Sequence, residues 1–186
     1  GSQRASELLR CRELDKGYLA LLSGSLQAEE TWDDVLRRDR TRNVTLVEPV
    51  PPGGAGADAA SAERGAAGSH ALSRVTPLLH AGGLTLALVS IETGRTHQIR
   101  AQAQAHGHPL AGDTKYGGGG NARSRSRTPR TYFLHAAVLV NRAPDAVFPE
   151  RIICALPGGE RREELLRHFS PAALEATLRC PTLAEA

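Results

Sequence analysis

Apolar residues gather in several short runs that are typical of strands. The run at 84–91 is apolar at nearly every position, which favours a central strand. With the run at 71–79 it flanks Gly82 and Gly83, so the two runs predict a β-hairpin. Further strands are predicted over 16–22, 44–47, 132–140 and 151–155, with a short strand or turn over 32–36 before a charged loop at 37–43.

Helical patterns are fewer and are expected over 4–11, 96–105, 163–169 and 171–178. Gly107 is well placed to end the second helix. Ser170 is a good N-cap for the last helix, with Pro171 at its first position. Strands and helices do not alternate as β-α-β units. The pattern therefore predicts an α+β fold, a mixed, mostly antiparallel sheet with flanking helices.

Two segments interrupt these patterns. Residues 50–68 consist mainly of Pro, Gly, Ala and Ser and cannot bury enough apolar surface to become ordered, so a flexible low-complexity loop is predicted over 50–70. Residues 117–130 are rich in Gly and Arg and are also predicted to form a loop. The 186 residues otherwise fit a single domain spanning 1–186.

Composition narrows the classes of function. The chain has 23 Lys and Arg against 20 Asp and Glu, a small positive excess that weakly favours a polyanionic partner. Its three cysteines form no CxxC pair, which argues against a disulfide framework or a zinc knuckle and favours a cytoplasmic location. No apolar run approaches the ~20 residues of a membrane span, so no membrane association is expected.

The most informative polar stretch runs from 92 to 117. A turn follows the predicted central strand, and a polar helix begins that carries Arg95, His97, Gln98 and Arg100. Three of these residues lie within one helical turn, and the helix N-terminus offers unpaired N–H groups and a partial positive charge. Together with two arginines, this arrangement favours binding of a phosphate or a carboxylate.

A tight loop after this helix holds Asp113, Lys115 and Tyr116. One cation and one aromatic ring in such a loop can hold an RNA backbone and stack on a base. Asp113 has the chemistry of a general base, but within a Gly-Asp turn an aspartate is more typically a brace for the loop.

Two other patterns leave alternatives open. His97, His106 and His108 suggest a metal, but no carboxylate lies at a recognised ligand spacing, so no metal site is expected. The arginine-rich run that contains Arg123 and Arg125 is either a solvated loop or an RNA contact.

Four sequence pieces together resemble a known family. Residues 93–100 read T-G-R-T-H-Q-I-R, and 107–117 read G-H-P-L-A-G-D-T-K-Y-G. This spaced motif closely resembles the signature of RluA-type RNA pseudouridine synthases. The K-G-Y-L-A-L run at 16–21 resembles the family's K-x-Y-x-A-L strand, and F-L-H-A at 133–136 resembles its L-H-A strand. The Thr-His pair in the first motif favours the RluA side over the related RsuA-type branch.

The resemblance implies a catalytic domain of the pseudouridine synthase type. Such enzymes detach uracil from a uridine in RNA, rotate it and rejoin it through carbon, without a cofactor or metal, after the nucleotide is flipped out of its stack. By resemblance, Tyr18 packs against the flipped base, and Arg95 pairs with a catalytic aspartate and keeps it ionised. The residues expected to shape the site or contact RNA are His97, Gln98, Arg100, Lys115 and Tyr116, with Arg123 and Arg125 as further RNA contacts.

One part of the family pattern is missing. The H-R-L-D-x-x-T-S/T-G motif that carries the catalytic aspartate occurs nowhere in the sequence. Asp15 imitates it within R-E-L-D-K, but it lacks the histidine and lies only three residues before Tyr18, so we reject it as the nucleophile. Residues 4–12 resemble the helix that follows the motif. The chain is therefore expected to be a fragment that begins just after the motif and is inactive alone.

Two classes of function follow from this pattern. The first is an RNA pseudouridine synthase that acts on structured rRNA or tRNA as a monomer. The second is a non-catalytic RNA-binding protein that kept the fold and lost the chemistry. An upstream H-R-L-D-type motif would distinguish them.

Overall fold

The fold is organised around one antiparallel sheet. The computed structural model describes residues 2–11, 13–48, 68–117, 131–145 and 148–178. Within these segments seven strands pair in the order β3-β2-β4-β5-β1-β6-β7, and every pairing is antiparallel. The α+β class is confirmed, and the sheet, predicted to be mixed but mostly antiparallel, is antiparallel at each of these pairings.

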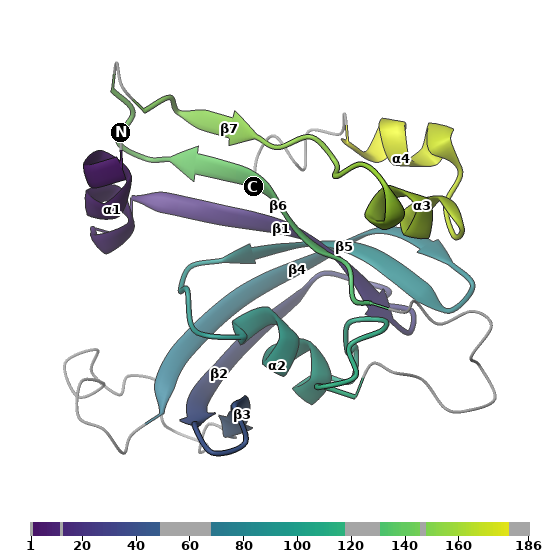
Figure 1. Cartoon of the computed structure of the whole chain (residues 1–186), viewed down its shortest axis with the longest axis horizontal. Coiled ribbons are helices and arrows are strands. Elements are labelled where there is room, and N and C mark those ends of the chain that lie inside the picture. The colour runs from purple at the N-terminus through teal and green to yellow at the C-terminus, as the bar shows by residue number, and fades with distance from the viewer. Residues whose placement is uncertain (1, 12, 49–67, 118–130, 146–147, 179–186) are drawn as a thin grey trace.

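Most of these elements coincide with runs that the pattern predicted (Figure 1). The strands are β1 (Leu14–Ser23), β2 (Glu30–Asp39), β3 (Val44–Glu48), β4 (Ser69–Ala81), β5 (Leu84–Ile91), β6 (Leu134–Asn141) and β7 (Arg151–Ile153). The helices are α1 (Ser2–Arg10), α2 (Gln98–Ala105), α3 (Glu160–Leu166) and α4 (Pro171–Leu178). The Ser170 cap is confirmed, because the Ala173 N–H donates to Ser170 Oγ at 3.2 Å.

Strand β2 shows the largest departure from the predicted elements. It continues to Asp39 through part of the segment expected to be a charged loop. Hydrogen bonding to β3 on one side and β4 on the other extends the strand. Burial alternates along it, with Trp32, Asp34 and Leu36 buried, so one polar residue occupies an inward position. That buried aspartate hides the alternation from a reading based on hydrophobic residues alone.

Several boundaries also differ from the expectation. Ser69 and His70 belong to β4, although the low-complexity loop was predicted to reach residue 70. Helix α2 begins two residues later than predicted, because His97 has a left-handed backbone with φ of 56°. Helix α3 lies three residues earlier than expected. The rest of the two predicted loops, over 50–67 and 118–130, lies outside the described residues.

A hydrophobic core lies on each face of the sheet. On one face Leu19 and Leu21 of β1 pack with Leu165 of α3 and with Phe169, which follows that helix. The opposite face is covered by α2, and its core contains Ala20, Leu22, Val89, Ile99, Ala103 and Leu110. Figure 1 shows α3 and α4 next to each other and well apart from α2. Strand β1 therefore serves both cores.

The segment after α2 is joined directly to β1. Leu110 forms a β-bridge with Leu22, and the Ser23 N–H donates to Pro109 O at 2.8 Å. The Ala111 N–H donates to Leu21 O at 2.8 Å. These bonds fix the 107–117 loop beside the sheet. No helix in the described segments combines the length and apolar character that a membrane crossing requires.

Gly17 offers a test of the packing between β1 and β6. A Cβ atom there would overlap Val138 Cγ1 and approach Leu88 Cδ1 to 3.3 Å. Val138 is β-branched and has little rotamer freedom to move away. We expect Gly17→Ala to lower the free energy of unfolding by about 1–3 kcal/mol in chemical denaturation.

Gly158 provides the matched control, because a Cβ there would meet nothing within 4 Å. Gly158→Ala should change the free energy of unfolding by less than ~0.5 kcal/mol. Equal effects of the two variants would show that close packing at Gly17 is not the cause.

Candidate active site

The side chain of Gln98 holds the turn that carries Arg95. Its Oε1 accepts hydrogen bonds from Thr93 Oγ1 at 2.8 Å and from the Arg95 N–H at 3.0 Å. Its Nε2 donates to Leu72 O at 3.1 Å and to Ser73 Oγ at 3.0 Å. The amide thus makes four hydrogen bonds, the full capacity of a glutamine side chain. Since Gln98 is only 2% exposed, it acts as a buried brace for the turn.

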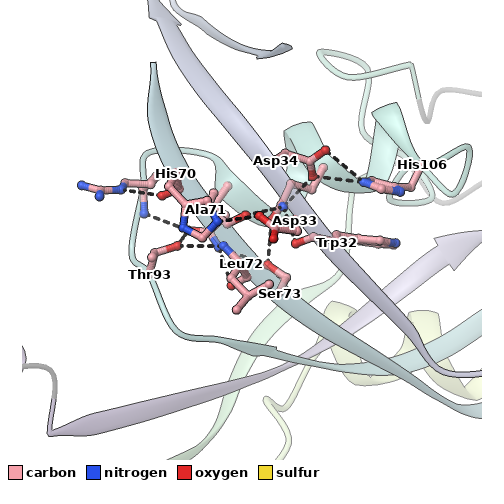
Figure 2. A network of polar contacts seen from close by, with 12 residues as sticks. Trp32, Asp33, Asp34, His70, Ala71, Leu72, Ser73, Thr93 and His106 are labelled. Carbon is pink, nitrogen blue, oxygen red and sulfur yellow. Dashed lines mark hydrogen bonds and ion pairs between the residues drawn. The ribbon is translucent and has the colours of Figure 1, made fainter. Parts of the chain in front are cut away.

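Gln102, one helical turn later, extends this network to β2, whose Trp32 and Asp34 are labelled in Figure 2. Its Oε1 accepts from Ser73 Oγ at 2.7 Å. The two hydrogens of its Nε2 are shared among three acceptors, Trp32 O at 3.0 Å, Asp34 Oδ2 at 2.7 Å and Ala71 O at 3.2 Å. The side chain is fully buried. Helix α2 is therefore bound to β4 and β2 through two glutamines spaced four residues apart.

The end of α2 is held by His106. Its Nε2 lies 3.0 Å from Asp34 Oδ2, and its ring stacks on Trp32 with centroids 5.1 Å apart and planes 14° apart. This part of the network was not predicted, because His106 was considered only as a metal ligand. The sequence signals that could have revealed it are the alternate positions of Trp32 and Asp34 on β2 and the glutamine pair on α2.

The Arg95 side chain itself is exposed. Its Nε donates to His70 O at 3.2 Å, and among the described residues no carboxylate pairs with it. Gln98 binds the main chain of Arg95 and so determines where its side chain begins. The guanidinium is not bound by Gln98 and remains available to an anion.

Tyr18 lies on the α2 face of the sheet. It packs, half-buried, against the core that includes Ala20 and Ile99, and this burial raises the pKa of its phenol. Lys16, two residues earlier, pairs with the last residue of β5, and a Cβ on Gly94 would lie 3.5 Å from Lys16 Nζ. The Arg95 turn therefore adjoins the strand that carries Tyr18. A pocket shared by the two side chains stays a prediction.

Arg100 and Asp113 form a nearly buried ion pair. The two nitrogen–oxygen distances are 2.6 and 2.7 Å, and the Arg100 guanidinium also lies 4.4 Å from the centroid of the Tyr132 ring. Burial alone would raise the pKa of the Asp113 carboxyl, but hydrogen bonds from Arg100 and from the Tyr116 and Lys115 N–H groups outweigh it and lower the pKa. Asp113 is thus the expected loop brace and not a free base.

Tyr116 connects the loop to β3. Its hydroxyl accepts from the Thr45 N–H at 2.8 Å and lies 2.9 Å from His97 Nδ1. The ring is only 6% exposed, so it offers no free face for stacking on a base in this structure. Burial of Gln98 and Tyr116 argues that both support the site from within and do not touch RNA directly.

His97 is surrounded by positive groups. Burial lowers its pKa first, and the charges of Arg100, Lys115 and Arg38 lower it further. Arg38 Nη1 and the Tyr116 hydroxyl both lie within hydrogen-bond distance of His97 Nδ1. Because these two neighbours can donate, we infer that Nδ1 is the unprotonated nitrogen of a neutral ring.

The other predicted site residues are dispersed. The Lys115 side chain is exposed, whereas Arg123 and Arg125 lie outside the described residues. The three histidines considered for a metal have separate surroundings: Tyr116 for His97, Asp34 for His106 and the Ser23 carbonyl for His108. In the described part of the chain, no three His, Cys, Asp or Glu residues are grouped to hold a metal.

These features agree with comparisons to known proteins. Residues 1–105 match the model of the RNA pseudouridylate synthase family, and the chain belongs to that family. The matched segment contains the 93–100 motif and confirms the assignment that this motif predicted.

Two curated relatives illustrate the similarity. An uncharacterized RNA pseudouridine synthase of Bacillus subtilis is 34% identical over 118 residues, which cover 63% of this chain and 34% of the relative. The ribosomal large subunit pseudouridine synthase D of Vibrio cholerae is 31% identical over 127 residues, covering 68% of this chain and 32% of the relative. The chain thus spans about a third of the length of these relatives.

Solved structures show the same fold. Human RNA pseudouridylate synthase domain containing 1 superposes with a TM-score of 0.62 at 25% identity, covering 97% of this chain and 73% of that one. Human RNA pseudouridylate synthase domain containing 4 gives a TM-score of 0.67 at 19% identity, over 91% of this chain and 69% of that one.

Replacing Gln102 tests the buried network. Gln102→Leu keeps the side-chain volume but leaves the Asp34 carboxylate, the Ser73 hydroxyl and main-chain carbonyls short of partners. We expect the free energy of unfolding to fall by about 2–4 kcal/mol in urea denaturation. Gln104 lies on the exposed side of the same helix, and Gln104→Leu should change it by less than ~0.5 kcal/mol. Similar losses would mean that the network contributes little.

The lowered pKa of His97 predicts a pH dependence of stability. The unfolded chain binds this proton more readily than the folded protein, so the stability linked to His97 is present above its ordinary pKa of about 6.5 and falls as the pH drops below it. Asparagine tolerates the left-handed backbone and does not titrate here. His97→Asn should therefore flatten the plot of unfolding midpoint against pH between ~7.5 and ~5. An unchanged slope would remove His97 from this role.

Proposed function

We propose that the protein containing this chain is an RNA pseudouridine synthase, an isomerase that converts uridine in structured RNA to pseudouridine. One observation carries the proposal: the Arg95 turn, braced by a buried Gln98, adjoins the β1 strand on whose α2 face Tyr18 lies. Family membership supports the chemistry, and the geometry supports these two residues as its carriers.

The proposed role of Arg95 is to pair with the nucleophilic aspartate. A guanidinium beside a carboxylate favours the ionised form, which is the nucleophile. The aspartate then attacks the nucleoside of a uridine that has been flipped out of its stack. The bond between the uracil nitrogen and the sugar breaks, and the base rotates. A uracil carbon then bonds to the sugar and displaces the aspartate. That carbon loses one proton and the freed nitrogen gains one, so the product has the same composition as the substrate.

The proposed role of Tyr18 is to pack against the flipped base and take part in proton transfer. A tyrosine phenol with its ordinary pKa of about 10 is protonated at neutral pH, and burial raises the pKa of Tyr18 further, so it enters the reaction as a hydrogen-bond donor and not as a phenolate. The apolar core beneath it excludes water from that side of the base.

The nucleophile in this proposal comes from outside the described residues. Asp15 forms a bidentate pair with Arg142, at 2.6 and 2.7 Å, and Asp113 is paired with Arg100. Both carboxylates are therefore committed to partners other than Arg95. We also propose rRNA or tRNA as the substrate, a cytoplasmic location, a monomer, and a single catalytic domain to which residues 1–186 belong.

The activity is tested by incubating the full-length protein with cellular RNA from a strain that lacks the corresponding gene. The expected result is new pseudouridine, detected by chemical derivatisation and mass spectrometry. Absence of product with any RNA, together with retained RNA binding, would favour a non-catalytic RNA-binding protein.

Arg95→Ala is expected to reduce turnover by at least ~100-fold, because the carboxylate loses its charged partner. The Arg95 main chain and the Gln98 brace remain, so the unfolding midpoint should not change. Arg74→Ala serves as the control, since Arg74 is an exposed arginine of β4 whose ion-pair partner among the described residues is the distant Glu29, at 3.9 Å. Near-normal rates in the Arg95 variant would exclude Arg95 from the reaction.

A further inference from the structure

The turn between β2 and β3 presents a group of arginines at the edge of the sheet. We name residues 37–43 the arginine arm; it contains Arg37, Arg38, Arg40 and Arg42. Residues 40–43 are all exposed, and the Arg42 side chain is 78% exposed. Such a concentration of one charge in seven residues costs stability through repulsion unless an anion neutralises it.

The two arginines at the tip are poorly neutralised within the protein. Arg37 pairs with Glu48 at 2.5 Å, but Arg42 lies 3.8 Å from Asp39. Arg40 has no ion-pair or hydrogen-bond partner among the described residues. The tip is nonetheless an ordered turn, because the Arg42 N–H donates to Asp39 Oδ1 at 2.9 Å. Arg40, and Arg42 with its long contact to Asp39, are thus presented on a defined backbone.

The base of the arginine arm is bonded to the candidate active site. Thr45, the second residue of β3, donates its hydroxyl to Thr96 O at 2.7 Å and its N–H to the Tyr116 hydroxyl at 2.8 Å. Arg38 Nη1 lies 3.3 Å from His97 Nδ1. Figure 1 shows β2 and β3 beside α2 and away from α3 and α4. The arm is therefore placed relative to the Arg95 turn by at least three polar contacts.

We propose that the arginine arm binds the RNA sugar–phosphate backbone next to the target uridine. The inference rests on the proposed function and assigns it a contact surface. The tip contains arginine, threonine and asparagine but no aromatic residue, so it suits phosphates and not base stacking. It accordingly contributes affinity that does not depend on RNA sequence.

The surroundings of the arm support an anionic partner. Lys115 is exposed, and Arg38, Arg100 and Lys115 all act on His97 as positive neighbours. A phosphate chain passing from the arm towards the Arg95 turn would neutralise this surface. Tyr116, which was expected to touch RNA, acts in this arrangement through the hydrogen bond that holds β3.

The test compares two double variants of the full-length protein. Arg40→Ala with Arg42→Ala removes the charges of the arm. Arg161→Ala with Arg162→Ala removes the same charge from exposed positions on α3, far from α2. Binding to a substrate RNA and to an unrelated structured RNA is measured by filter binding over a range of salt concentrations.

The arm variant is expected to bind both RNAs about 10- to 30-fold more weakly at ~0.15 M salt, and the slope of log K against log salt should decrease by about 1.4–1.8, the value for two phosphate contacts. The α3 variant should weaken binding by less than ~2-fold and leave the slope unchanged. Arg40→Lys with Arg42→Lys should retain most of the affinity, because lysine keeps the positive charge.

Several outcomes would overturn the proposal. Equal losses in the arm and α3 variants would indicate a general charge effect. A loss confined to the substrate RNA would indicate base recognition in place of phosphate contact. Competition by polyglutamate as effective as by RNA would indicate binding to any polyanion. If the parent protein makes no pseudouridine, the proposed function fails, but the binding comparison still decides whether the arm contacts RNA.

Discussion

The structure depends on a continuous line of buried hydrogen bonds from the Arg95 turn to β2. Gln98 holds the turn and shares the Ser73 hydroxyl with Gln102, which reaches Asp34. Each group in this line is enclosed, so loss of one leaves its neighbours without water as a substitute. The position of a solvent-exposed guanidinium is thereby determined by interactions deep in the protein, and α2 cannot shift along the sheet without breaking several bonds at once.

Much of the fold could be predicted from the sequence, because strong apolar runs and turn residues agree. The hairpin of β4 and β5 and the Ser170 cap on α4 are examples. Strand β2 could not be predicted at its full length, because its inward positions include Asp34, whose partners come from α2. A buried polar residue of this kind is recognised only when the tertiary contact that satisfies it is known.

The candidate site was predicted as a set of residues but not as an arrangement. The motif at 93–100 identified the correct turn, yet residue type alone cannot show which polar side chains face inward. Gln98 and Arg100 resemble RNA ligands by their chemistry, but the first is a buried brace and the second is engaged by Asp113. Periodicity was also misleading at His97, whose left-handed backbone delays the start of α2.

The placement of separate cores on the two faces of β1 has a practical consequence. Side chains that point towards α3 and α4, such as Leu19 and Leu21, belong to a core that, among the described residues, includes none from the Arg95 turn or α2. Substitutions that improve packing on that side should combine additively with changes at the other face, because the two sets of side chains lie on opposite faces of β1 and β5. The fold thus separates the side chains that can be optimised for thermal tolerance from those that support the candidate active site.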